Sequence, residues 1–408
     1  MSRDHLLEQR CSFATSTNTL PPDSLLIGLS SIHIRESWKY GERAFRYCQH
    51  DAGHAIAALR YAAATLGWQV HLLDTWGDAE IGVSLGLDRE ADFGAAEREY
   101  PDLMLLVTTS SSAVNTSMFA ANGLIEAAQN GDWQGKANVL SPEKPIGWTV
   151  IEQVSRASLK PRTQHTFWSS PSFPAPLSSA CKLSAAEIIK QRRSAQNFDS
   201  STLIPASAFY RILDMTLPRP DIAPWDAIDW EPRIHLFLFV HRVEGLVPGL
   251  YIFLRNNYIE EQLRAELSAE FEWLPVAGCP EHFSLFLLLG ADMQKAARTL
   301  SCHQSIASHG AFSLGMLAEY QANLALRPWI YRQLFWEAGM LGQVLYLEAE
   351  AANVRGTGIG CYFDDEVHDL LGIKTQTFQS MYHFTVGGAI TDTRLQTLAA
   401  YEHLQRKG

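Results

Sequence analysis

The chain has 408 residues, of which 47% are hydrophobic and 19% are charged, so it can form a globular protein of two or three domains. Its formal net charge of −11 argues against a general binder of nucleic acid or of anionic membranes, because both need a positive field. Any positively charged binding site is therefore expected to be local.

In the first part of the chain, helix formers at 42–67 end at a glycine and predict a helix, and 69–74 predicts a strand. A short helix is expected at 77–86 and a buried strand at 103–109. In the second part we expect helices at 184–191, 205–215, 331–353 and 364–371, strands at 233–242, 250–255, 283–289 and 381–387, and a glycine-rich turn at 355–360. Strands and helices are mixed throughout, which predicts an α+β or α/β class.

The stretch 156–180 is rich in Pro and Ser and has no periodicity, which is typical of a linker. We therefore divide the chain into a first module at 1–160, a linker at 161–182 and a second module at 183–408.

An internal repeat appears when the chain is compared with itself at an offset of 286 residues. Arg46 then meets Arg332, and Gly53 meets Gly339. Nine of the 45 residues in 43–87 are identical to their counterparts, several times what average composition gives. This predicts a tandem duplication of a helix, a strand and a second helix. Because the second copy has far more sequence before its long helix, we expect the first copy to lack its N-terminal half.

The cysteines are scattered, without a CxxC pair or a disulfide-type spacing, and predict reduced thiols in a cytoplasmic protein: Cys11, Cys48, Cys181, Cys279, Cys302 and Cys361. The N-terminal residues contain no apolar segment of the signal-peptide kind, and no apolar run reaches about 18 residues. We therefore expect neither a secretion signal nor a membrane span.

Two arginines and a serine, Arg192, Arg193 and Ser194, follow the short helix at 184–191. Arginine offers a planar, permanently charged donor fork and serine adds a hydroxyl, so the motif can hold a phosphate. The alternative is a basic helix end that complements the helix dipole. The spacing alone leaves both interpretations open.

Two later segments could add to such a site. The glycines of RGTGIG at 355–360, among them Gly358 and Gly360, would let the backbone approach a ligand closely, or they would only form a turn. The spacing differs from that of a dinucleotide-binding fingerprint. Arg394, after the last predicted strand, is either a third positive contact or a surface arginine.

His50 and His54 lie four residues apart on one helix face, with Cys48 nearby, as some zinc sites require. No third ligand stands at a fixed local spacing, and His54 meets Met340 in the repeat, which is a packing position. We therefore expect no metal site.

Several of these segments together resemble the nitroreductase family, and most of all its tandem members related to the dehydrogenases that form thiazole and oxazole rings in modified peptides. They are RRSxxxF after the linker, EAG in the long helix, FDDEVHDLLGI after the glycine-rich turn, and VGxxxxDxR near the end. The resemblance covers about 30–130 and 184–395. It implies an α+β sandwich of a mixed or antiparallel sheet with helices, in two copies that form a pseudo-dimer.

The resemblance also implies FMN, bound at the seam between two copies of the fold. By position, the flavin contacts would be Arg192, Arg193, Ser194, Gln196, Gly358, Gly360 and Arg394. NAD(P)H would reduce the FMN, which would then pass hydride or electrons to a nitro, quinone or azoline-type substrate, either a small molecule or a peptide. The resemblance implies no particular general acid or base. A homodimer is a further expectation, and neither nucleic acid nor a membrane is expected as a partner.

Two positions depart from the family pattern. Gln196 stands where the family usually has an arginine, so the position can donate a hydrogen bond but brings no charge. The Pro-Ser-(Ser/Ala)-Gly stretch that usually lies against the flavin ring is also absent from PWDAIDWEPRIHLFLF, at 224–239. These departures give the alternative hypothesis of a degenerate nitroreductase fold that acts as a scaffold or binding partner without catalysis.

Overall fold

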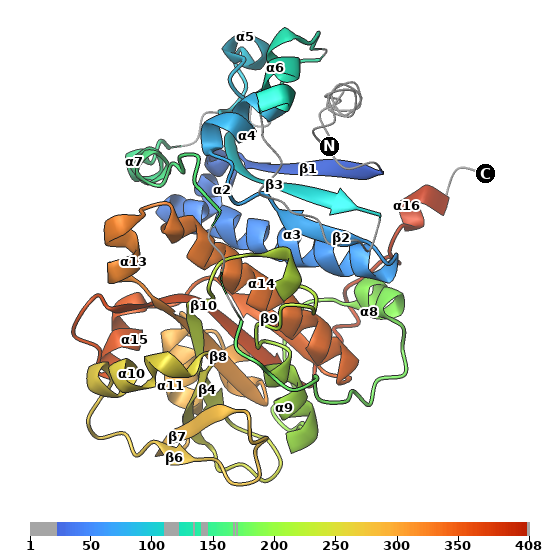
Figure 1. The fold of residues 1–408 in the computed structure, drawn as a ribbon. Helices are drawn as coiled ribbons and strands as arrows, with labels where there is room; N and C mark the ends of the chain where they lie inside the picture. Colours follow the sequence, from blue (N-terminus) through green and yellow to red (C-terminus); the bar gives the residue numbers. More distant parts are fainter. Residues whose placement is uncertain are drawn as a thin grey trace. The chain divides into compact units, whose positions relative to one another are not determined.

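The computed structural model contains two compact units, each built from more than one stretch of the chain (Figure 1). It describes residues 23–109, 122–133, 135–139, 146–165, 168 and 170–405. The first unit comprises Met1–Ser169, Pro220–Glu231 and Leu324–Trp336. The second comprises Ser170–Arg219, Pro232–Asn323 and Glu337–Gly408.

The first unit contains a three-stranded antiparallel sheet in the order β1-β3-β2. The central strand β3 is the most apolar of the three, and its residues from 102 to 108 are all buried. The strands are β1 Ser24–Ser31, β2 Gln69–Leu72 and β3 Tyr100–Thr108. The helices are α2 His33–Tyr40, η1 Gly41–Arg43, α3 Ala44–Thr65, α4 Asp78–Leu85, α5 Glu90–Phe93, α6 Asn122–Asn130, α7 Thr149–Ala157 and η3 Trp225–Ala227.

Buried ion pairs tie the two later stretches of the chain into the first unit. The guanidinium of Arg332 donates to Asp78 at 2.7 Å, at the start of α4. Arg60 of α3 donates to both carboxylate oxygens of Asp226, at 2.8 and 2.7 Å. Because each pair joins residues far apart in sequence, a periodicity analysis cannot reveal this organisation.

The second unit contains a seven-stranded antiparallel sheet in the order β6-β7-β5-β4-β8-β10-β9. Its strands are β4 Ile234–Val240, β5 Gly249–Leu254, β6 Leu274–Pro275, β7 Ser284–Gly290, β8 Phe312–Glu319, β9 Arg355–Ile359 and β10 Phe378–Gly387. Its helices are α8 Ala185–Gln191, α9 Ala206–Asp214, η4 Asn257–Ile259, α10 Glu260–Glu266, α11 Gln294–Leu300, α12 Ile306–His309, α15 Asp364–Leu371 and α16 Glu402–Gln405. Two further helices have residues in both units, α13 Gln321–Leu326 and α14 Ile330–Ala351.

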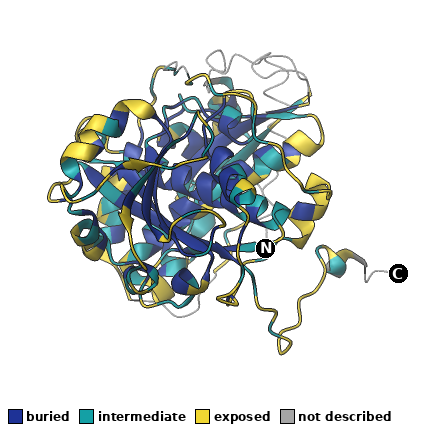
Figure 2. Cartoon of the chain, turned by 90° about the horizontal axis from the view of Figure 1, so that it is seen from below, coloured by how far each residue is buried: buried dark blue, intermediate teal, exposed yellow. Residues whose placement is uncertain are grey.

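Helices cover both faces of this sheet, which explains why β4 is buried at every position and why all its residues but His235 are apolar. One face packs Phe237 and Phe239 against residues of α10, α11, α12 and α15. On the other face, Phe209 of α9 lies 5.1 Å from Phe312, and Tyr346 of α14 lies 4.8 Å from Phe384, measured between ring centroids. Figure 2 shows the buried strands inside and exposed residues on the outer helices. The predicted α+β class is confirmed.

The helices that the repeat matches have the same lengths in both copies. Helix α3 at 44–65 corresponds to α14 at 330–351 under the offset of 286, and α4 at 78–85 corresponds to α15 at 364–371. Both short helices end at a glycine with a left-handed conformation, Gly86 with φ 69° and Gly372 with φ 77°.

The prediction of a turn at 355–360 was wrong, because 355–359 is the edge strand β9, paired with β10. The glycines were misleading because they serve cross-strand packing rather than chain reversal. A Cβ atom at Gly358 would lie 1.9 Å from the hydroxyl of Tyr382, and one at Gly356 would lie 2.5 Å from the ring of Phe384. Both positions therefore need glycine to accommodate the large side chains of β10.

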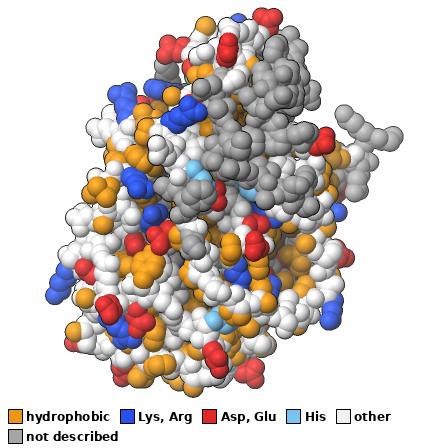
Figure 3. All heavy atoms as spheres, viewed as in Figure 1, with side chains coloured by type: hydrophobic (Ala, Val, Ile, Leu, Met, Phe, Trp, Pro, Cys, Tyr) orange, Lys and Arg blue, Asp and Glu red, His pale blue; other side chains and the backbone are white. Residues whose placement is uncertain are grey.

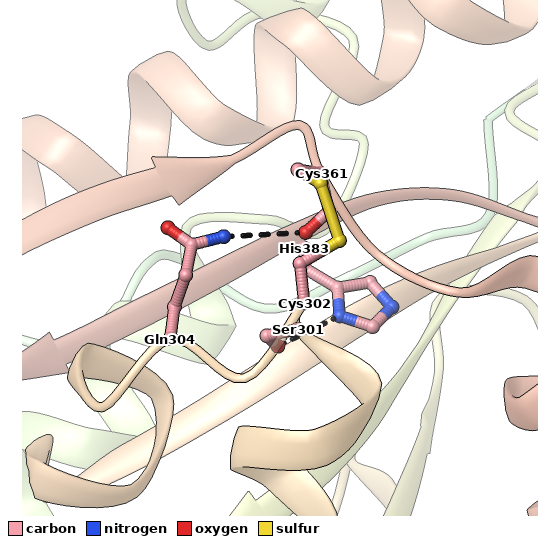
Figure 4. The surroundings of a disulfide bond; sticks show 5 residues. All are labelled: Ser301, Cys302, Gln304, Cys361 and His383. Atoms are coloured by element: carbon pink, nitrogen blue, oxygen red, sulfur yellow. Dashed lines mark hydrogen bonds between the residues drawn. A yellow bond between two sulfur atoms is a disulfide. The ribbon is translucent and has the colours of Figure 1, made fainter.

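The expectation of reduced thiols was also wrong for two cysteines, because Cys302 and Cys361 form a disulfide with a Cα–Cα distance of 5.9 Å (Figure 4). They are 59 residues apart, one after α11 and the other after β9, and only the fold brings them together. Gln304 donates to the carbonyl of Cys361 at 3.3 Å. Sequence spacing gave no signal for this pair.

No helix among the described residues is both long enough and apolar enough to cross a membrane. On the face drawn in Figure 3, basic and acidic side chains of the described residues are interspersed, so a basic site on that face would have to be local.

The buried imidazole of His241 should make the stability of the second unit depend on pH. Burial lowers the pKa of His241 to about 4, although a hydrogen bond with the Ala307 carbonyl at 3.1 Å opposes the shift. Between about pH 4 and 6.5 the unfolded chain therefore binds a proton that the folded chain does not. Stability should rise with pH across this window, by about 3 kcal/mol, and level off above it.

Urea unfolding at intervals between pH 4 and 8 tests this expectation in the wild type and in His241→Gln. The variant should lose most of this rise in stability. The exposed His309 gives the matched control, since His309→Gln should keep the wild-type slope. An unchanged slope in His241→Gln would contradict the assignment.

Candidate functional site

The Arg-Arg-Ser motif begins where helix α8 ends. Ser184 and Glu187 form a capping box at the start of this helix, and Arg192 is its C-cap, with its N–H bonded to the carbonyl of Ile188 at 3.0 Å. The motif therefore leaves the helix in an extended conformation, which places Arg193 and Ser194 beyond the helix end.

Tyr346 of α14 joins the motif to the glycine-containing strand β9. Its hydroxyl lies 3.0 Å from the hydroxyl of Ser194 and accepts the N–H of Gly358 at 2.9 Å. The guanidinium of Arg192 lies over the Tyr346 ring, 4.8 Å from its centroid. Thr357 of β9 also donates to the carbonyl of Ala195 at 2.6 Å. The structure thus brings the Arg-Arg-Ser motif together with Gly358, which the sequence analysis had treated as separate features.

A cavity of about 850 Å³ opens beside this junction, within the second unit. Its basic lining residues are Lys190, Arg193 and Arg355, from α8, the motif and the start of β9. Ser194 and Gln196 also line it, whereas Glu187 and Asp392 bring carboxylates. Three cations against two carboxylates leave a local positive balance in a chain whose net charge is −11.

A further carboxylate lies close to these arginines. Glu350 of α14 is mostly buried and lies 4.0 Å from the guanidinium of Arg355. Burial raises the pKa of Glu350, while Arg355 and then Arg192 lower it. The arginines therefore favour the ionised form of Glu350, and Glu350 in turn holds Arg355 near the cavity wall.

Arg193 has a structural role as well as a place on the cavity wall. Its Nη1 donates to the carbonyls of Lys190 at 3.1 Å and of Arg192 at 2.8 Å, and Nη2 donates to the carbonyl of Leu398 at 3.4 Å. The first of these bonds satisfies a carbonyl at the end of α8. The helix-end interpretation and the cavity interpretation are therefore compatible for this residue.

Two of the predicted contacts lie apart from this cluster. Arg394 is highly exposed and pairs with Asp392 at 2.7 Å, and Gly360 follows β9 beside Cys361. Neither is among the described residues that line the cavity. Asp392 does line it, so Arg394 influences the cavity through the charge of its partner.

The sequence did not single out Tyr346, Arg355 or Lys190. Tyr346 lies inside the long helix, where an aromatic residue is usually core. Arg355 is the first letter of RGTGIG, whose glycines drew the attention, and Lys190 resembles any basic residue in a last helical turn. Only the position of Arg355 beside the glycines could have been a signal.

His50, one of the two histidines considered for a metal site, takes part in core packing. His50 is buried on α3 and packs edge-on against Phe335, 5.0 Å between ring centroids. Among the described residues, a different group, Asp74, His165 and Asp229, has possible ligand atoms within 4.8 Å of one another. The Nδ1 atom of His165 lies 3.6 Å from the Asp74 carboxylate.

No protein-family model matches the sequence, and no curated protein does so. Among solved structures, a protein from Anabaena variabilis assigned as a nitroreductase matches with a TM-score of 0.61 at 19% identity, over 94% of this chain and 73% of its own. The Escherichia coli microcin synthetase McbBCD complex, with truncated pro-MccB17 bound, gives a TM-score of 0.35 at 16% identity, over 65% of this chain and 87% of its own. A protein from Exiguobacterium sibiricum assigned as a nitroreductase, in complex with FMN, gives 0.32 at 12% identity, over 56% of this chain and 98% of its own. The first match shows that the chain has a nitroreductase-like fold.

Proposed function

We propose that this chain, which has a nitroreductase-like fold, is an FMN-dependent oxidoreductase that passes hydride or electrons from NAD(P)H to a second substrate. The observation that carries the proposal is the cavity of the second unit, where the Arg-Arg-Ser motif meets β9 beside Tyr346. We further propose that the two units arose by tandem duplication, which the matching bounds of α3 and α14 support.

The donor set of the cavity suits a phosphate ester. Lys190, Arg193 and Arg355 supply charge, and Ser194 and Gln196 supply neutral hydrogen-bond donors. Gln196 stands where the family motif has an arginine and brings no charge. Arg355, on the wall of the same cavity, supplies a guanidinium that offsets this departure. The volume of about 850 Å³ lies within the range of pockets that bind ligands of cofactor size.

FMN would supply the redox chemistry, by accepting hydride from NAD(P)H and giving hydride or electrons to the second substrate. The residues of the chain would bind and orient it. Arg193 and Arg355 would hold the phosphate, and Tyr346 would fix the backbone of Gly358 and the hydroxyl of Ser194 beside it.

The second substrate that we propose is a nitro, quinone or azoline-type acceptor, either a small molecule or a peptide. The pairing of the two modules as a pseudo-dimer, a homodimer, the module boundaries at 160 and 183, and a cytoplasmic location also remain predictions. They need solution experiments on the intact protein.

A turnover assay tests the proposed function. Purified protein, supplied with FMN and with NADH or NADPH, should oxidise the nicotinamide when a quinone or nitroaromatic acceptor is added. The heat-inactivated protein is the control for reaction by free flavin. If the protein retains FMN but does not turn over, the enzyme hypothesis is rejected and the scaffold hypothesis is favoured.

Replacing Arg193 with alanine should weaken FMN binding by about 1.5–3 kcal/mol, the scale of a hydrogen bond to a charged group. Arg355→Ala should have an effect of the same order, because both guanidinium groups line the same cavity. Fluorescence titration of FMN measures both affinities. Arg298→Ala, an exposed arginine outside the cavity lining, should bind FMN like the wild type. Unchanged FMN affinity in both cavity variants would mean that Arg193 acts only at the end of helix α8.

A further inference from the structure

Three side chains that can bind a metal ion meet within the first unit, whereas the proposed flavin cavity lies within the second. Asp74 follows strand β2, Asp229 follows η3, and His165 lies after α7. One ligand atom of each, a carboxylate oxygen or an imidazole nitrogen, lies within 4.8 Å of the other two. Because the three residues are far apart in sequence, no local spacing indicated this group.

Contacts of other residues hold the three segments together. The backbone N–H of Thr163 donates to the carbonyl of Thr75 at 2.9 Å, which ties the stretch before His165 to the residues after β2. Arg60 joins β2 to the stretch around η3, because its guanidinium donates to Gln69 at 2.9 Å and to Asp226 at 2.8 Å. The backbone around the three side chains is therefore positioned by contacts that need no ion.

The separations within the group suit a single ion. Zinc binds imidazole nitrogen and carboxylate oxygen at about 2.0–2.2 Å, so two ligands of a tetrahedral site lie about 3.4 Å apart. The Nδ1 atom of His165 lies 3.6 Å from a carboxylate oxygen of Asp74, which is too long for a hydrogen bond but close to this spacing. Ligand atoms up to 4.8 Å apart reach it by side-chain movements of about 1 Å.

The charges around the group favour a cation. Two carboxylates so close together repel each other in a partly buried setting. The ammonium of Lys160 does not bridge them, because it donates to the carbonyl of Trp76 at 2.9 Å and to the hydroxyl of Thr163 at 3.0 Å. Among the described residues, the Asp229 carboxylate accepts no hydrogen bond. A divalent ion would supply the positive charge that this pair of carboxylates lacks.

An ion can reach the group from solvent without unfolding of the chain. The side chain of Asp74 is 14% exposed and that of His165 is 12% exposed. Asp229 is also partly exposed. The small side-chain movements that bring the ligand atoms together take place at the surface of the first unit.

We propose that Asp74, His165 and Asp229 bind one divalent transition-metal ion, for which zinc is the best match. A set that combines imidazole with carboxylates suits zinc and its neighbours, whereas magnesium and calcium take oxygen ligands. Three protein ligands leave a fourth position for water. The ion ties the end of β2 to the two later stretches of the first unit and stabilises that unit, because it binds the folded chain.

Metal titration of the full-length protein, after removal of bound metal with a chelator, tests the proposal. Excess zinc chloride should raise the melting temperature by about 5 °C or more, and magnesium chloride at the same concentration should not. Cobalt(II), which can replace zinc and is coloured, should bind with the visible absorption of a four-coordinate complex. A wild-type protein that neither gains stability with zinc nor shows this cobalt absorption would overturn the proposal.

Variants assign the ion to these residues. Asp229→Asn and His165→Gln should each weaken zinc binding by at least about 10–100-fold, the range known for groups that only orient a ligand. Asp221→Asn, at an exposed position of the same stretch as Asp229, is the matched control and should bind zinc like the wild type. Zinc affinity that is equal in Asp229→Asn, His165→Gln and Asp221→Asn would show that the ion binds elsewhere and refute the site.

Discussion

Gly53→Ala should lower the free energy of unfolding of the first unit by about 3 kcal/mol or more. A Cβ atom at this position would lie 2.1 Å from the backbone oxygen of Trp336 and 2.7 Å from its carbonyl carbon. Backbone cannot turn aside as a flexible side chain can, so α3 would have to move away from the residues around Trp336. That movement would also disturb the hydrogen bond from Trp336 Nε1 to Gln49, which is 2.7 Å long.

The expected change in stability is opposite in sign to that of most glycine-to-alanine substitutions in helices, because alanine normally stabilises a helix interior by about 1 kcal/mol relative to glycine. Gly82, inside α4 of the same unit, is the matched control, since the nearest atom to a Cβ there lies 3.9 Å away. Gly82→Ala should therefore be neutral or stabilising. Thermal and urea unfolding of both variants measure the difference. Equal stability of the two variants would show that α3 and the Trp336 backbone are not in close contact.

Glu337→Ala should destabilise the second unit by about 3–5 kcal/mol, the cost of leaving a buried partner charge uncompensated. The Glu337 carboxylate is 1% exposed and pairs with Arg255, which is equally buried. It also accepts the backbone N–H groups of Arg233 at 2.9 Å and Ile234 at 3.2 Å. Truncation would therefore leave a guanidinium and two backbone donors without this acceptor.

The double variant Glu337→Gln with Arg255→Met separates the charge from the packing. Glutamine keeps one acceptor oxygen, so one of the two backbone donors retains its partner, and methionine removes the buried cation. The loss should therefore be smaller than in Glu337→Ala. Glu260→Ala breaks the partly exposed pair with Arg264 and should cost less than about 1 kcal/mol. A Glu337→Ala variant as stable as Glu260→Ala would contradict the buried pairing. Urea unfolding measures all three.

Local sequence patterns predicted both 22-residue helices, α3 and α14, and six of the strands, but not β1, β6, β8 or β9 and not most of the shorter helices. The helix at 364–371 has the expected bounds, and α14 at 330–351 differs from the expected helix by one or two residues. The pattern was informative because apolar periodicity and a terminal glycine depend only on neighbouring residues. Edge strand β9 was missed because its glycines are required by contacts with Tyr382 and Phe384 on the neighbouring strand β10, which local sequence does not reveal.

The candidate site, too, could be predicted from local sequence only in part. The charge and spacing of Arg192, Arg193 and Ser194 pointed to an anion, and the structure places two of them, Arg193 and Ser194, on a cavity. Tyr346 and Arg355 could not be found in this way, because their contribution depends on α14 and β9 meeting the motif. The Cys302–Cys361 disulfide likewise depends on two loops that only the fold brings together.

The most direct test of the account is whether the purified chain binds FMN. The protein is incubated with excess FMN and passed through a desalting column, and the flavin absorbance of the protein fraction is compared with that of Arg193→Ala, Arg355→Ala and Arg298→Ala. We expect the wild type and Arg298→Ala to elute yellow with stoichiometric flavin, and the two cavity variants to lose most of it. A wild-type protein that elutes colourless, and that does not quench the fluorescence of added FMN, would contradict the proposal that this chain is an FMN-dependent enzyme.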